Sequence, residues 1–326
     1  MKLRQKLLLA LGVSLFVYFT TRAGWHAILN EICKLKWNFI PLLTVYGFVN
    51  CWDTLGWRFA FHPRVCCVNF FRLFWIRIAG EAVNNTTPTG YVGGEPVKAM
   101  LLKPYGISMT ESMSSLVIAK TTMALSQLLF VVIGLVFAYN RLDISNALRG
   151  VVLACFGLLI ILVFLFLFLQ SRGLFSGSAK FFIHLKIGRT FLTNIMHKIV
   201  EMESLMMTFY KEYKIRFLIS FFFHFLGWLA GIFEIFLIVH WLKLPLDLGD
   251  ALMIEALHQL IRGLAFMVPA NLGTQEGGNL FIFTSLGFGG ALGLSVSLIR
   301  RVRELFWSGL GWVIIMNSKV NAGKKQ

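Results

Sequence analysis

Two polar, glycine-rich stretches, residues 84–96 and 269–278, interrupt the apolar parts of the sequence and carry its most distinctive side chains. Glycines leave backbone N–H groups accessible, and helices that start after Pro88 and Pro96 would point the positive ends of their dipoles at a bound anion. A phosphate group has the charge and the acceptor oxygens for such a site. The candidate residues are Asn84, Asn85, Pro88, Gly93, Gly94, Glu95, Lys98, Pro269, Asn271, Gly273, Gln275 and Glu276.

Both stretches also have a purely structural interpretation. The first is then a polar loop in water between two helices. Glu95 and Glu276 either orient a substrate and gate its path, or cap backbone N–H groups that the breaks leave free.

The two stretches share one spacing, because residues at an offset of 181 positions match in type. Several matches at one offset are harder to ascribe to chance than a single glycine or proline. We therefore predict one membrane domain over 1–326 that contains two internal repeats, about 1–147 and 148–326. The offset relates Pro88 to Pro269, Glu95 to Glu276, Gly106 to Gly287, Lys120 to Arg301 and Asp53 to Glu234.

The composition indicates a membrane protein that is all-α. Of the 326 residues, 57% are hydrophobic and only 14% are charged, and the mean hydropathy is +0.73. Since a spanning helix needs roughly 20 apolar residues, the chain has room for about six to eight spans. The net charge of +16 comes from basic residues between apolar runs, where they set topology and attract anionic lipid, so we do not expect nucleic-acid binding.

Hydropathy and charge together predict a topology. Each repeat contains two spans, a re-entrant hairpin and a closing span, which gives six full spans plus two hairpins, with eight full spans as the alternative. Three spans separate the hairpins, so the halves have opposite orientations, as in secondary transporters. The positive charges predict a cytoplasmic N-terminus and a basic, amphipathic, cytoplasmic segment at 171–214. The apolar runs are 7–21, 39–59, 65–79, 116–139, 151–169, 217–241, 251–268, 280–298 and 305–316.

Ionisable residues within the apolar runs are the other candidates for function, since a charge at that depth is costly unless it is paired or hydrated. Asp53, Glu234, Glu255 and His258 are candidates for proton coupling. Arg262 shares a helix face with Glu255 and His258, so a structural ion pair between Glu255 and Arg262 is the alternative. Basic residues that flank the hairpins suit lipid phosphate, or serve as topology determinants and anchors: Lys98, Lys103, Lys120, Arg300, Arg301 and Arg303.

No motif predicts catalysis or metal binding. The five cysteines form no CxxC pair, and no histidine lies at ligand spacing from them. There is no DxD metal motif and no HxxxxD dyad. We therefore expect neither a catalytic residue nor a metal or other cofactor.

Three segments, 93–98, 268–278 and 297–305, resemble the flippase-like family, also called the lysylphosphatidylglycerol synthase transmembrane-region family. The stretch 269–278 is most similar to the branch associated with hopanoid biosynthesis. This resemblance implies translocation of an amphipathic lipid, such as a hopanoid or an anionic or aminoacylated phospholipid, across the bacterial inner membrane. It also implies lipid-biosynthesis enzymes as partners. The alternatives are a non-catalytic membrane partner of such enzymes, or a transferase for polyprenyl-linked substrates. The sequence lacks the soluble transferase domain of the aminoacyl-lipid synthases, so we do not expect it to make lysyl-lipid by itself.

Overall fold

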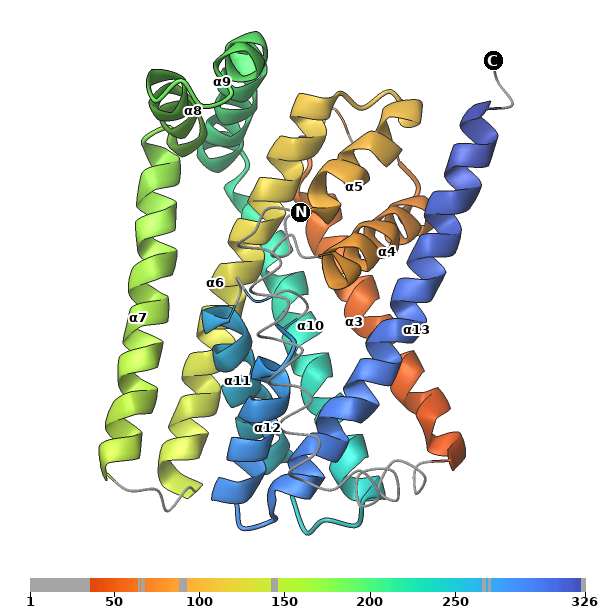
Figure 1. Cartoon of the computed structure of the whole chain (residues 1–326), viewed down its shortest axis with the longest axis vertical. Coiled ribbons are helices and arrows are strands. Elements are labelled where there is room, and N and C mark those ends of the chain that lie inside the picture. Colours follow the sequence, from red (N-terminus) through yellow and green to blue (C-terminus); the bar gives the residue numbers. More distant parts are fainter. Residues whose placement is uncertain are drawn as a thin grey trace.

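The computed structural model describes residues 36–63, 65, 68–87, 93–141, 146–265, 268 and 271–323. Every regular element in these ranges is helical, which confirms the predicted all-α class (Figure 1). The predicted first span at 7–21, the N-terminus, Pro88 and Pro269 lie outside the described residues. The helices are α3 (Phe39–Ala60), α4 (Phe70–Thr86), α5 (Gly94–Leu102), α6 (Met109–Arg141), α7 (Asn146–Ser171), α8 (Leu174–His184), α9 (Arg189–Glu212), α10 (Lys214–Trp241), α11 (Leu248–Leu264), α12 (Thr274–Ser285) and α13 (Gly290–Gly323), with short 3-10 turns at Lys36–Asn38 and Lys103–Tyr105.

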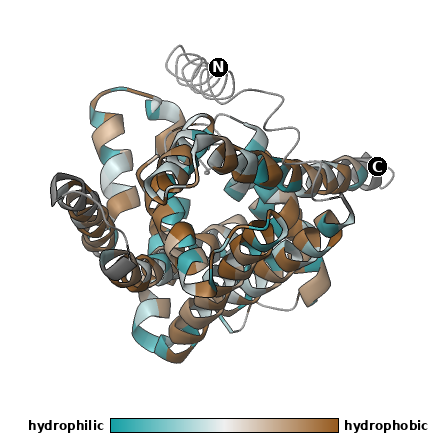
Figure 2. Cartoon of the chain, turned by 90° about the horizontal axis from the view of Figure 1, so that it is seen from below, coloured by the Kyte–Doolittle hydropathy of each residue, from teal (hydrophilic) through white to brown (hydrophobic). Residues whose placement is uncertain are grey.

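Two of the described helices are long and apolar enough to cross a membrane. They are Met109–Tyr139 of α6 and Lys214–Trp241 of α10, with mean hydropathies of 2.1 and 2.0. Both match predicted spans. Phe156–Gln170 of α7 and Leu174–His184 of α8 are long and apolar enough to cross a membrane only when they are taken together. The angle between these two helices is 81°. The outward surface of α7 is apolar, and the view along the long axis shows helices coloured as hydrophobic over much of their length (Figure 2).

The last third of the chain differs from its hydropathy pattern. The apolar runs 280–298 and 305–316 do not each form one helix, because the first is divided between α12 and α13 and the second continues α13. The helix passes through Arg300 and Arg303, which are buried to 2% and 1% exposure. Both arginines have carboxylate partners inside the protein, so the charges do not force the chain out to water.

The first polar stretch is also more helical than predicted. Helix α4 continues to Thr86, so Asn84 and Asn85 lie on a helix and not in a broken segment. The hydroxyls of Thr86 and Thr87 donate to backbone carbonyls one turn earlier, both at 2.6 Å, which satisfies polar groups without interrupting α4. Helix α5 begins at Gly94 and not after Pro96.

Small residues allow the helices around the centre to approach closely. A Cβ atom added to Gly94 would lie 2.0 Å from the carbonyl oxygen of Gly80, so only glycine fits where α5 meets α4. A Cβ added to Gly311 would lie 2.5 Å from the carbonyl oxygen of Ile78, where α13 crosses α4. Close backbone approach of this kind is a common basis of helix association in membranes.

The helix boundaries recur at the offset found in the sequence. Figure 1 shows α4 and α5 in the upper half of the molecule and α11 and α12 in the lower half. Helix α6 runs downward in this view, whereas α13 runs upward to the C-terminus. Adding 181 to the bounds of α3, α4, α5 and α6 gives 220–241, 251–267, 275–283 and 290–322, against 214–241, 248–264, 274–285 and 290–323 for α10, α11, α12 and α13.

The basic segment 171–214 forms a helical hairpin, α8 and α9, at the upper end of the molecule (Figure 1). The Glu203 carboxylate of α9 accepts hydrogen bonds from the backbone N–H groups of Phe175 and Ser176, at 2.8 and 3.0 Å, and so caps the start of α8. The Tyr210 hydroxyl accepts a hydrogen bond from Gln170 at 2.9 Å, which connects α9 to the end of α7, and burial raises the pKa of this hydroxyl. The predicted amphipathic helices are therefore present, and they are fixed to the rest of the protein.

Candidate functional site

A polar cavity of about 360 Å³ lies among α3, α4, α6, α10, α11 and α13. A smaller cavity of about 20 Å³ adjoins it and shares Asp53, Arg77, Glu81, Lys120 and Met123 with it. The larger volume lies within the range of small-molecule sites, roughly 300–1,000 Å³. Its polar lining residues are Tyr46, Asp53, Arg77, Glu81, Asn85, Lys120, Gln127, Trp228, Glu234, Glu255, Gln259, Arg262, Asn271, Arg300 and Arg303.

Asp53 of α3 is the centre of one buried network. Arg77 of α4 donates to Asp53 at 2.6 Å and, through its other terminal nitrogen, to Asn50 at 2.6 Å. His224 Nδ1 of α10 lies 2.8 Å from the second oxygen of Asp53. This carboxylate therefore joins three helices, and its charge is matched by the guanidinium of Arg77.

The first hairpin carries a second network, in which two cations share two carboxylates. Lys98 of α5 donates to Glu81 at 2.6 Å and to Glu95 at 3.1 Å. Lys120 of α6 lies 3.4 Å from Glu95, and 39% of its side chain is exposed. The Asn84 side chain accepts from Gly94 N at 2.7 Å, so the protein itself occupies the N-terminus of α5. That helix end is therefore not the free anion site predicted from the sequence.

The second half builds its network around Glu234 of α10. Arg303 of α13 donates to one oxygen of Glu234, and Arg300 donates to the other at 3.3 Å. Arg300 also donates to Glu255 of α11 at 2.8 Å and contacts His258 Nδ1. The alternative prediction paired Glu255 with Arg262. In the structure, the guanidinium that donates to Glu255 is that of Arg300.

Glu276 of α12 has two roles, one for each carboxylate oxygen. One oxygen accepts from Gly273 N at 2.8 Å, which is the capping role proposed as the structural alternative. The other accepts from Arg301 Nε of α13 at 2.9 Å. Arg301 also donates to the Asn271 carbonyl at 3.1 Å, and so it holds the turn before α12 against α13.

The two halves meet across the cavity at Tyr46. This α3 side chain places its ring 3.7 Å from the guanidinium carbon of Arg303 on α13, a cation–π contact. In the charge networks around the cavities, the cations and carboxylates of each half are equal in number when the histidines are neutral. The first half has Arg77, Lys98 and Lys120 against Asp53, Glu81 and Glu95, and the second has Arg262, Arg300, Arg301 and Arg303 against Glu234, Glu255, Glu276 and Glu304.

The structure brings together only part of the predicted site. Gly93 and Gly273 precede α5 and α12, and buried Gln275 lies in the first turn of α12. Among the described residues, Asn84 and Glu276 accept from the backbone at the starts of α5 and α12, so these helix starts are occupied by the protein itself. Asp53, Asn85, Glu234, Glu255, Arg262 and Asn271 line the larger cavity, Glu95 and Lys98 line the smaller one, and Asn84, Gly94, His258, Glu276 and Arg301 bond to helix ends or to cavity residues.

Sequence reasoning missed Asn50, Arg77, Glu81, His224 and Gln259, all of which contribute to the buried networks. Arg77 lies in the apolar run 65–79, and His224 lies in the run 217–241. The signal that identifies both is the one used for Asp53, an ionisable residue within or beside an apolar run.

A comparison with known protein families identifies the family of this chain. The sequence profile described as the lysylphosphatidylglycerol synthase transmembrane region matches residues 6–311. The chain belongs to this family. A relative described as a UPF0104 membrane protein, from the archaeon Methanothermobacter thermautotrophicus, is 24% identical over 323 residues, covering 94% of this chain and 93% of the relative. No solved structure matches the chain significantly.

Family membership and apolar helices together identify a multi-pass membrane protein, and the family description connects it with lipid metabolism. The family match spans both halves of the cavity, from α3 to most of α13. The charge networks therefore belong to the family region of the chain.

Proposed function

We propose that this protein translocates an amphipathic lipid across a membrane, with the headgroup in the central cavity and the acyl chains in the bilayer. The observation that carries the proposal is the cavity of about 360 Å³, lined by charged groups from both halves, inside a bundle with apolar outer helices. A polar headgroup cannot cross hydrocarbon without a large desolvation cost. Buried charges that are already arranged in pairs can replace its hydration.

The arrangement of the hairpins supports alternating access. The α4–α5 hairpin and the α11–α12 hairpin occupy opposite halves of the molecule (Figure 1). The second helix of each hairpin is tied to the following long helix by an ion pair, Glu95 with Lys120 and Glu276 with Arg301, and Glu255 of α11 adds a pair with Arg300 of α13. Opening one pair at a time would expose the cavity to one side of the membrane, as expected for an inverted repeat.

Lys120 is the cation that we assign to the headgroup. It lines both cavities, and its side chain is more exposed than those of Arg77, Arg300 and Arg303. Its contact with Glu95, at 3.4 Å, is longer than the 2.6 Å contact between Lys98 and Glu81. A lipid phosphate that binds Lys120 would replace Glu95 and free the hairpin to move.

The proposal extends to orientation and coupling. The basic hairpin α8–α9 and the N-terminus are assigned to the cytoplasmic side of the inner membrane, in keeping with the positive-inside rule. Two buried carboxylate–histidine contacts, Asp53 with His224 at 2.8 Å and Glu255 with His258 at 3.8 Å, are assigned to proton coupling. The protein moves its lipid without changing it chemically.

Reconstitution in vesicles tests the proposal. Vesicles of phosphatidylcholine and phosphatidylglycerol carry a trace of fluorescent phosphatidylglycerol, and a membrane-impermeant quencher reports exchange between leaflets. We expect rapid exchange with the protein and at least about a tenfold loss in Lys120→Met, the effect of losing one charge-assisted contact to a phosphate. Lys103→Met is the matched control, because Lys103 is exposed and lies outside both cavities. Chemical modification of the lipid, or exchange no faster than in protein-free vesicles, would contradict the proposal.

A further inference from the structure

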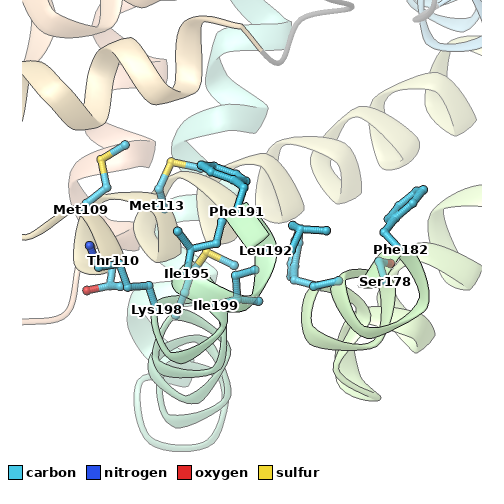
Figure 3. Close-up of a pocket in the computed structure, with 13 residues that line it drawn as sticks. Met109, Thr110, Met113, Ser178, Phe182, Phe191, Leu192, Ile195, Lys198 and Ile199 are labelled. Atoms are coloured by element: carbon cyan, nitrogen blue, oxygen red, sulfur yellow. The ribbon is translucent and has the colours of Figure 1, made fainter. Parts of the chain in front are cut away.

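A third cavity is larger and far more apolar than the central site. A groove of about 550 Å³ lies between the start of α6 and the α8–α9 hairpin (Figure 3). Its volume is within the range of small-molecule sites. The lining residues are Met109, Thr110, Met113, Phe175, Ser178, Ala179, Phe182, Phe191, Leu192, Ile195, Lys198, Ile199 and Met202.

Lys198 is the one charged residue among the lining residues that the structure describes, and it lies at one end of the groove. Thr110 and Lys198 lie close together at one side of the view, and Phe182 lies at the other (Figure 3). Thr110 donates to Glu201 at 3.0 Å. Lys198 takes part in no ion pair among the described residues, so its ammonium is available to a ligand. The groove therefore suits an amphipathic molecule with an acidic head and an apolar tail.

The position of the groove indicates which amphipathic molecule reaches it. The outer face of α7, which leads directly into α8, exposes Phe164, Phe168 and Leu169, and so faces acyl chains. The hairpin itself exposes Phe181 to 60% and Phe191 to 67%. Apolar side chains this exposed, in helices with basic residues, are typical of segments that lie in the headgroup region of a membrane.

Charge selects among the lipids present there. Residues 171–214 contain seven lysines and arginines against three glutamates, a net charge of +4 with neutral histidines. Basic segments at a membrane surface attract anionic lipid, about 1 kcal/mol for each lysine or arginine. Two of the three glutamates are engaged within the protein, Glu203 as the α8 cap and Glu201 with Thr110.

We propose that this groove binds one acyl chain of an anionic phospholipid, with the phosphate at Lys198. This site is separate from the central cavity, and none of its lining residues lines that cavity. It does not rest on the proposed translocation, because a bound lipid here would fix the hairpin to α6 whether or not lipid is moved.

Photolabelling tests the inference in the full-length protein. The protein is placed in phosphatidylcholine vesicles with a minor fraction of phosphatidylglycerol that carries a photoreactive group on one acyl chain, and labelled peptides are mapped. We expect labels on 109–113, 175–182 and 191–202. Equal labelling by the same probe built on phosphatidylcholine would overturn the anionic assignment, and labels confined to α7 would overturn the groove.

Matched variants separate the groove from the general surface. Lys198→Gln should reduce labelling about fivefold, the effect of one basic charge, whereas Lys180→Gln should change it less, because Lys180 is exposed outside the groove. Ile195→Trp fills the groove and should also reduce labelling. Val200→Trp is its control, since Val200 is 49% exposed on the same helix and outside the lining. If both lysine variants lose labelling equally, the lipid binds only the surface charge, and the inference fails. The map of the unmodified protein decides the matter even if a tryptophan variant does not fold.

Discussion

Arg301 Nε on α13 donates to Glu276 Oε1 on α12 at 2.9 Å, and the Glu276 side chain has no exposed surface. The residues 181 positions earlier, Lys120 and Glu95, also form an ion pair, at 3.4 Å. Each pair ties the second helix of a hairpin to the long helix that follows it. The two pairs differ in exposure, because 39% of the Lys120 side chain is exposed and only 14% of the Arg301 side chain.

This difference predicts unequal effects on stability. Arg301→Met leaves a buried carboxylate without its cation, and removal of one partner of a buried pair costs roughly 3–5 kcal/mol. The double variant Arg301→Met/Glu276→Gln should recover most of that loss, because it removes the uncompensated charge. Unfolding by denaturant in detergent micelles, followed by circular dichroism, measures the free energies.

Lys120→Met is the comparison for that experiment. Loss of Lys120 leaves Glu95 paired with Lys98, so this variant should unfold close to the unmodified protein even though it loses exchange activity. Equal destabilisation by Lys120→Met and Arg301→Met would show that the two pairs have the same structural role, against our assignment of Lys120 to the headgroup.

Helix packing at Gly94 gives a second prediction. A methyl group at this position would meet the Gly80 carbonyl oxygen at 2.0 Å, and backbone cannot move aside as a side chain can. Gly94→Ala should therefore destabilise the protein by about 1–3 kcal/mol, as overpacking does in cores. Gly157→Ala on α7 is the control, because nothing lies within 4 Å of the added atom. Alanine there should be neutral or stabilising by up to about 1 kcal/mol. A Gly94→Ala protein as stable as the control would show that α4 and α5 are free to separate.

The sequence predicts those helices whose apolar character is continuous. Helices α6 and α10 follow from hydropathy, because burial in lipid requires an uninterrupted apolar run of sufficient length. Hydropathy does not predict helix α13, because Arg300 and Arg303 interrupt its apolar sequence and pair with carboxylates on other helices. Glu234, the partner of Arg303, lies 69 positions away in the sequence, and the local sequence pattern does not predict a pair at that separation.

The site shows the same limit. The common offset identified Glu95 and Glu276 as candidate site residues, and both form ion pairs in the structure. It did not identify Arg77, because the residue 181 positions later is His258, which differs in type. The two halves thus keep helix positions in common and share a cation at Lys120 and Arg301, but they do not share one at the position of Arg77.

Proton coupling gives a third prediction, at Asp53 and His224. This pair borders the cavities, with 2.8 Å between Nδ1 and the carboxylate. A pH gradient across the vesicles should change the initial rate of lipid exchange, because the pair can exchange a proton with each side in turn. Asp53→Asn should abolish the response to the gradient while some exchange continues without one. Glu212→Gln, at the end of α9, should respond like the unmodified protein. Exchange insensitive to the gradient in the unmodified protein would remove proton coupling from the mechanism.

The cap of α8 gives the last prediction, and it depends on neither proposed lipid site. Glu203 satisfies the backbone N–H groups of Phe175 and Ser176, which follow Gly173 at a φ of 80° in the turn from α7. Glu203→Ala removes the only acceptor that the described residues offer these two groups, at a cost of about 1 kcal/mol. Amide hydrogen exchange at 174–178 should then be faster by about fivefold, since that free energy corresponds to such a ratio. Exchange within α10 should not change, because α10 lies beyond the hairpin. Glu212→Gln should leave both regions unchanged, and faster exchange throughout the chain in Glu203→Ala would show that the cap supports the whole fold and not the hairpin alone.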